Sequence, residues 1–110
     1  MEGNPVPANL GLIIIINRQA TDAIVRCIGR ITSDTTQSLK ATVKPLFSES
    51  TRVVLDLTDV TYLDSSGLGA IIGLYVSAKL ANCQLKVIIC PNESLEKLFR
   101  ITRLDQVVAA

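Results

Sequence analysis

Residues 53–72 read VVLDLTDVTYLDSSGLGAII, a pattern that predicts a strand, a loop and a helix in succession. It opens on Val53–Leu57, a short and nearly continuous apolar segment that is typical of a central strand covered on both faces. A loop around Asp64-Ser65-Ser66-Gly67 follows and leads into a helix that ends near Leu80. The apolar positions that predict this helix, and that should face the core, recur at helical spacing: Leu68, Ile71, Ile72, Tyr75 and Val76.

The segments on either side extend this unit into a sheet. A second apolar strand, Gln84–Ile89, follows the helix, which predicts a βαβ unit with parallel strands and a right-handed crossover. Upstream, Leu12–Ile16 and Ala23–Ile28 flank the turn residues 17–20 and predict an antiparallel hairpin that ends at Gly29. We therefore expect an α/β domain with a mixed sheet of four to five strands, an antiparallel hairpin followed by the parallel βαβ unit, flanked by helices.

Another helix is predicted between the hairpin and the central strand. It begins near Asp34, with Ser33 or Asp34 as its N-cap, and Pro45 should stop or kink it at Lys44 because proline disfavours helical geometry in the preceding residue. Its apolar positions are Leu39, Val43, Leu46 and Phe47.

The ends of the chain complete this single domain, residues 1–110. Residues 1–9 are expected to form a flexible N-terminal extension. After Pro91, Asn92 can cap a helix whose core-facing positions are Leu95, Leu98 and Phe99, and Gln106–Val108 would add an edge strand.

Composition narrows the function classes. The chain has 110 residues, 48% hydrophobic content and a net charge of +1, with no basic stripe, so it supports one core and no nucleic-acid surface. Its apolar runs are too short to span a bilayer, which predicts a cytoplasmic protein without direct membrane insertion. The three cysteines lack Cys-x-x-Cys spacing, so we expect buried, reduced thiols and no metal site.

The chain contains no histidine, which removes Ser-His-Asp and Cys-His catalysis. Gly67-x-Gly69-x-x-x-Gly73 is one residue too long for a dinucleotide fingerprint, and Gly-x-Ser-x-Gly is absent around Ser65. We therefore expect no catalytic residues and no enzyme activity.

The loop before the second helix is the candidate functional segment. Ser66, or Ser65 itself, could cap that helix, where unpaired N–H groups and the helix dipole favour an anion. A phosphate on Ser65 would meet these donors and add about two negative charges. Gly67 and Gly69 would allow another chain's backbone to approach closely. A purely structural interpretation of Asp64, Ser65 and Ser66 as capping residues fits the local chemistry equally well.

Residues 53–72 closely resemble the core motif of STAS domains, in particular the bacterial anti-sigma factor antagonists. The resemblance extends to Gly29-Arg30-Ile31, to residues 84–90, and to Leu95-Glu96-Lys97-Leu98-Phe99 with Ile101-Thr102-Arg103-Leu104, so it covers nearly the whole chain. Many members of that family carry an acidic residue where this chain has Thr32.

This resemblance implies a phosphorylation switch. The first serine of the family's Asp-Ser-Ser-Gly motif, here Ser65, is phosphorylated by a partner that is both an anti-sigma factor and a serine kinase. The unphosphorylated form binds the partner and frees a sigma factor, and a phosphatase restores it. ATP is bound by the partner, so no cofactor is expected here. The implied partner-binding residues are Thr32, Asp34, Asp64, Ser65, Ser66, Gly67 and Leu68.

A rival within the same fold is an accessory STAS subunit or docking module of a membrane transporter or other signalling complex. Such a protein would use the same helix face constitutively, without phosphorylation. An Asp at position 65 separates the two hypotheses, because it should abolish binding only in the switched protein.

Overall fold

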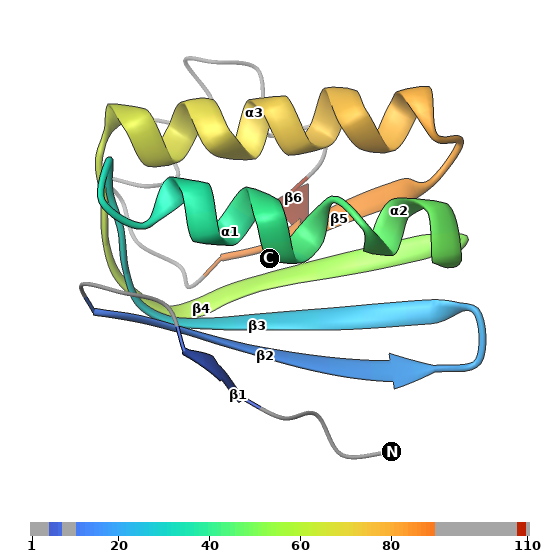
Figure 1. Cartoon of the computed structure of the whole chain (residues 1–110), viewed down its shortest axis with the longest axis horizontal. Helices are drawn as coiled ribbons and strands as arrows, with labels where there is room; N and C mark the ends of the chain where they lie inside the picture. The colour runs from blue at the N-terminus through green and yellow to red at the C-terminus, as the bar shows by residue number, and fades with distance from the viewer. Residues whose placement is uncertain (1–4, 8–10, 90–107, 110) are drawn as a thin grey trace.

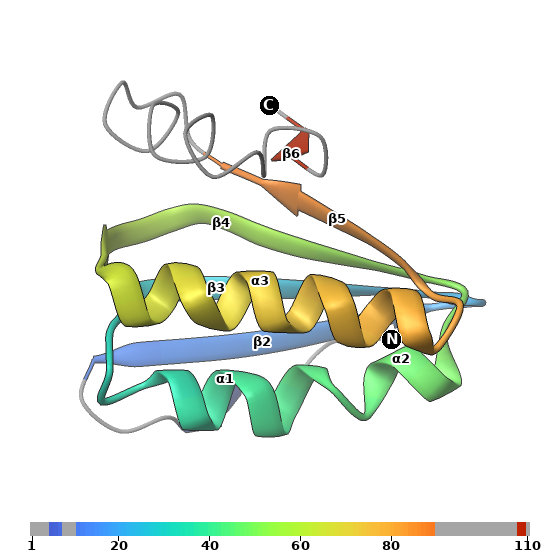
Figure 2. The same cartoon turned by 90° about the horizontal axis from the view of Figure 1, so that it is seen from above.

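A mixed sheet forms one layer of the molecule, and the helices pack on one of its faces (Figures 1 and 2). The computed structural model describes residues 5–7, 11–89 and 108–109. Within them the six strands follow chain order across the sheet; β1, β2 and β3 pair antiparallel, and β3 through β6 pair parallel. The elements are β1 Pro5–Pro7, β2 Leu12–Gln19, β3 Asp22–Ile31, α1 Thr36–Val43, α2 Leu46–Glu49, β4 Arg52–Leu63, α3 Ser65–Leu80, β5 Gln84–Ile88 and β6 Val108–Ala109.

The predicted hairpin is confirmed, with longer strands than expected. β2 and β3 pair antiparallel up to Gln19 and Asp22, so only Ala20 and Thr21 form the turn. Ala20 takes a positive φ of 53°, a backbone conformation suited to a tight hairpin turn. The polar residues 17–19, which suggested a longer turn, lie in β2.

β4 lies in the interior of the sheet, as predicted, and continues to Leu63, six residues beyond the expected strand end. Val53, Leu55 and Leu57 are buried, whereas Val54 and Asp56 between them are only half-buried. The expectation that helices cover both faces of this strand is therefore wrong for the described residues, because α1, α2 and α3 all lie on the same side of the sheet (Figure 1).

The predicted helix break at Pro45 is confirmed: α1 ends at Val43 and α2 begins at Leu46. The predicted N-cap is wrong. Thr35, rather than Ser33 or Asp34, immediately precedes α1. Ser33 and Asp34 instead lie in the turn that joins β3 to the helix.

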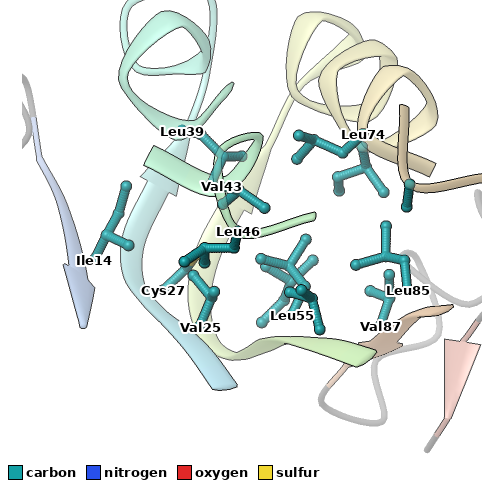
Figure 3. Close-up of a cluster of buried hydrophobic side chains, with 14 of the residues drawn as sticks. Ile14, Val25, Cys27, Leu39, Val43, Leu46, Leu55, Leu74, Leu85 and Val87 are labelled. Atoms are coloured by element: carbon teal, nitrogen blue, oxygen red, sulfur yellow. The ribbon is translucent and has the colours of Figure 1, made fainter. Parts of the chain in front are cut away.

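The core lies between the sheet and the helices, and Figure 3 shows part of it. Leu39 and Val43 of α1 and Leu46 and Phe47 of α2 are buried there, so the helix break keeps the predicted apolar positions in the core. The strands contribute a second row of buried side chains, namely Leu12, Ile14, Ala23, Val25, Cys27, Val53, Leu55, Leu57, Leu85 and Val87.

α3 buries only part of its apolar surface. Leu68, Ile71 and Leu74 are buried, and Tyr75 packs against the core from a half-buried position. Ile72 and Val76, which helical spacing placed on the core face, are exposed. The apolar positions run all round this helix, so periodicity alone could not select the buried side.

The two ends of the chain differ from expectation or lie outside the described residues. Pro5–Pro7, within the extension expected to be flexible, pairs with residues 13–15 of β2 as strand β1. The predicted helix around Leu95–Phe99 lies outside the described residues, and β6 begins at Val108, the last residue of the predicted edge strand. At 16 residues α3 is the longest described helix, and none of these helices combines the length and hydropathy of a membrane span.

Candidate functional site

The candidate site forms where the carboxyl ends of β3 and β4 meet, at the left of Figure 1. The two strands are parallel neighbours, and their last residues, Ile31 and Leu63, stand side by side. The Asp64 N–H donates to the Ile31 carbonyl at 3.3 Å, which joins the loop after β4 to the end of β3. The β3–α1 loop and the start of α3 therefore form one surface.

Asp64 is the N-cap of α3, which corrects the prediction that Ser65 or Ser66 would cap this helix. Its backbone is extended, and its Oδ1 accepts a hydrogen bond from the Gly67 N–H at 2.8 Å. The second carboxylate oxygen accepts from the Ser33 N–H at 3.4 Å. One side chain thus caps the helix and holds the neighbouring loop against it.

Gly67 permits a close approach within this chain rather than the predicted approach of another chain. A Cβ at this position would lie 2.5 Å from the Ile31 carbonyl oxygen and 2.6 Å from Leu63 Cδ1. Gly69 has open space around its missing side chain and is exposed. Of the two glycines, only Gly69 leaves surface for a partner.

The β3–α1 loop is fixed by a buried threonine that the sequence did not single out. The Thr35 hydroxyl donates to the Arg30 carbonyl at 3.0 Å and accepts from the Thr32 N–H at 2.9 Å. The Thr32 hydroxyl in turn accepts from the Asp34 N–H at 3.3 Å. Asp34 lies exposed in this loop.

Ser65 and Ser66 are the exposed residues of the first turn of α3. Because Asp64 serves as the cap, the Ser65 hydroxyl is not needed to begin the helix. Among the described residues, the N–H groups of Ser65 and Ser66 have no hydrogen-bond acceptor within the protein. These N–H groups lie at the positive end of the helix dipole, so they would stabilise a negatively charged group attached to Ser65.

The predicted partner-binding residues divide by burial. Asp34, Ser65 and Ser66 are exposed, and Thr32 and Asp64 are half-buried. Gly67 and Leu68 are buried inside the domain, which leaves them little surface to offer a partner.

An exposed cation–π pair flanks the site and was missed from the sequence. The Arg30 guanidinium carbon lies 4.7 Å from the centroid of the Tyr62 ring. The two residues are register partners on β3 and β4, a relationship that depends on a bulge and is not readable from spacing. A planar aromatic and a cation at the edge of the site offer a second kind of contact to a partner.

The described residues form neither a metal-binding cluster nor a reactive thiol. No three or more His, Cys, Asp or Glu side chains gather there as a metal site. Cys27 and Cys83 are buried free thiols, and burial together with the charge of Asp56 raises the pKa of Cys27 to about 12. Such a thiol stays protonated and is a poor nucleophile.

The comparison with protein families agrees with this geometry. The STAS domain model matches residues 14–109. The chain belongs to the STAS domain family. The anti-sigma-B factor antagonist of Listeria monocytogenes is 30% identical over 102 residues, which cover 90% of this chain and 88% of that relative. The resemblance inferred from residues 53–72 is thus confirmed over nearly the whole chain.

Solved structures share the fold at low sequence identity. The anti-sigma factor antagonist SpoIIAA in its unphosphorylated form superposes with a TM-score of 0.74 at 14% identity, over 87% of this chain and 85% of that one. The Bacillus cell fate determinant SpoIIAA in its phosphorylated form gives 0.71 at 14% identity, over 87% and 88%. The fold of this chain is therefore similar to the fold of SpoIIAA in both the unphosphorylated and the phosphorylated form.

Proposed function

We propose that this STAS domain is a cytoplasmic anti-sigma factor antagonist, a binding protein rather than an enzyme, that is switched by phosphorylation at Ser65. The unphosphorylated form binds an anti-sigma factor with serine-kinase activity and frees a sigma factor. The partner binds the ATP and phosphorylates Ser65, and a phosphatase reverses the modification. The name of the Listeria relative, an anti-sigma-B factor antagonist, supports this assignment.

The proposal rests on the different structural roles of Asp64 and Ser65. Asp64 caps α3, so the exposed Ser65 hydroxyl is left for modification without loss of the helix start. A phosphate there would be held by the unpaired amides of the first turn. It would also place about two negative charges beside Asp34 and Asp64, on the surface that a partner must desolvate. Repulsion and desolvation then explain the release of the partner.

The experiment compares wild type, Ser65→Ala and Ser65→Asp as baits in lysate of the native host, with retained proteins identified by mass spectrometry. The proposal expects a serine-kinase-type ATPase with the wild type and Ser65→Ala, and not with Ser65→Asp. Incubating the purified kinase with ATP and the wild type should then give a single phosphopeptide containing Ser65. Ser66→Ala is the matched control, because it removes the neighbouring exposed hydroxyl and should leave this modification in place.

Two outcomes would contradict the proposal. Retention of transporter subunits by all three baits would indicate a constitutive docking module. Phosphorylation of Ser66 or another residue in place of Ser65 would reject the site.

A further inference from the structure

The outer face of α3 is apolar over most of its length. Ile72, Val76 and Leu80 follow one another at intervals of one turn, and their relative exposures are 37, 51 and 82%. Gly69 and Ser65 lie on the same side, about one and two turns nearer the N-terminus than Ile72. Lys79 is the one charged residue of this helix.

A surface helix of a globular protein normally carries polar residues on the side opposite its buried stripe. α3 buries Ile71, Leu74 and Ala78 on its inner side and still carries three large apolar residues outside. A helix that is apolar all round is usually covered on all sides. The exposed apolar residues therefore indicate that the outer face of α3 is a contact surface.

The apolar face continues into a groove at the C-terminal end of α3. This groove has a volume of about 370 Å³ and is lined by Phe47 and Leu80 together with Lys44, Ser48, Ser77 and Ala81. These residues place the groove between α2 and the C-terminal end of α3, at the opposite end of the helix from Ser65. Figure 1 shows α2 beside this end of α3. An apolar groove between two helices is a surface on which a third helix can pack.

The charged residues around the apolar face and its groove indicate which chemistry a binding partner should have. Lys44 and Lys79 are exposed, and neither forms an ion pair with any described residue. Lys79 lies over the Tyr75 ring, 5.3 Å from its centroid, which holds the ammonium group beside the apolar face. Glu49, the acidic residue of α2, is engaged by Arg18. A cover for this face should therefore supply acidic side chains.

A second copy of this chain fits less well. If two α3 helices packed antiparallel, Lys79 of each would lie beside the positive N-terminal end of the other. If they packed parallel, the two Lys79 side chains would face each other. Both arrangements juxtapose positive charges.

We propose that the outer face of α3 and the groove beside Leu80 dock an amphipathic helix of the anti-sigma partner. The apolar side of that helix lies on Ile72, Val76 and Leu80, and its acidic residues pair with Lys44 and Lys79. This inference rests on the proposed function and extends it. The partner then contacts both ends of α3, so that Ser65 controls release while the far end supplies affinity.

The first arm of the test titrates the purified anti-sigma kinase into the wild type, Val76→Glu, Leu80→Glu and Lys79→Glu by calorimetry. Each substitution should weaken binding by about tenfold or more, since apolar anchors and their paired charges dominate interfaces. Ile13→Glu is the matched control, because Ile13 is 46% exposed but lies on β2, away from the helices. Circular dichroism establishes that each variant is folded.

The second arm needs no kinase. It uses a synthetic 18-residue helical peptide with leucines along one side and glutamates beside them, and a twin in which lysines replace the glutamates. NMR titration should show shifts at Ile72, Val76, Leu80 and Lys79 with the acidic peptide, about tenfold weaker binding of the twin, and weakening by added salt.

The outcomes separate this proposal from the proposed function. If Val76→Glu and Leu80→Glu bind the kinase as tightly as the wild type while Ser65→Asp does not, the docking surface is wrong and the switch stands. If Ser65→Asp binds normally while the α3 variants fail, the switch is wrong and the docking surface stands. If no kinase is found, the peptide arm decides, and absence of binding up to about 1 mM overturns the proposal. Sedimentation of a wild-type dimer that Val76→Glu dissociates would also overturn it.

Discussion

The Asp64 carboxylate accepts hydrogen bonds from the Gly67 N–H at 2.8 Å and from the Ser33 N–H at 3.4 Å. A single side chain therefore fixes both the start of α3 and the loop that follows β3. Together with the hydrogen bonds of the Thr35 hydroxyl, this arrangement positions the exposed residues Ser65 and Asp34. The stability of the site can thus be tested at a residue that is not itself modified.

Replacing Asp64 by alanine should lower the free energy of unfolding by about 1–2 kcal/mol, the usual cost of losing an N-cap. Asp64→Asn should recover most of this loss, because an asparagine oxygen also caps helices. Urea denaturation measures both. Asp34→Ala is the control, since this exposed side chain makes no hydrogen bond or ion pair with another described residue and its loss should change little. Equal effects of Asp64→Ala and Asp34→Ala would contradict the capping role.

Gly67→Ala and Gly69→Ala should change stability in opposite directions. At Gly67 the added methyl group would collide with the Ile31 carbonyl and with Leu63, and the free energy of unfolding should fall by about 3 kcal/mol. At Gly69 the methyl group meets nothing within 4 Å, so the higher helix propensity of alanine should raise stability by about 0.5–1 kcal/mol. Thermal and urea unfolding of the two variants provide the comparison. A stable Gly67→Ala protein would show that β3 and α3 can move apart at no cost.

The order of strands and helices and the pairing of the strands could largely be predicted from the sequence. β-branched runs and apolar helical spacing depend on local chemistry, and Pro45 interrupts the helix because its ring restricts the residue before it. Strand ends were less predictable. The polar residue Asn17 suggests a turn, yet its pairing with Ile24 of β3 keeps it in β2.

The site at Ser65 stays a prediction, and the structure corrects the roles that the sequence assigned to its neighbours Ser66 and Gly67. Sequence identified a helix start rich in capping residues, whereas the choice of Asp64 over Ser65 depends on an extended backbone conformation. The role of Gly67 depends on how closely Ile31 approaches, which is a tertiary distance. Arg30 and Tyr62 are brought together only by the register of two parallel strands.

Ser65→Asp should leave the fold intact, so that any loss of partner binding reports on the interface. An acidic residue in the first turn of α3 gains about 0.3–1 kcal/mol from the helix dipole, and repulsion from Asp64 offsets part of this gain. The free energy of unfolding should therefore change by less than about 1 kcal/mol. Urea denaturation of Ser65→Asp and Ser65→Ala measures the difference, with circular dichroism as the check on structure. A loss of several kcal/mol on introducing Asp would mean that binding defects of this variant reflect unfolding.

The Cys27 thiol should resist alkylation in the native protein and react once the chain is unfolded. Burial, and secondarily the charge of Asp56, raises the pKa of this thiol from 9.0 to about 12, so the thiolate is scarce and shielded at pH 8. Mass-spectrometric peptide mapping after iodoacetamide treatment, with and without urea, reports each cysteine separately.

The raised pKa of the Cys27 thiol makes the free energy of unfolding depend on pH. Above about pH 9 the unfolded chain loses the Cys27 proton while the folded chain retains it, so the stabilisation is complete below pH 9 and is lost as the pH rises toward 12. The slope from this group should reach about 1.4 kcal/mol per pH unit. Cys27→Ala lacks the titrating group, so its stability deficit relative to the wild type should narrow across this range. A constant deficit from pH 8 to pH 11, or rapid labelling of Cys27 in the native state, would show that the thiol is open to solvent.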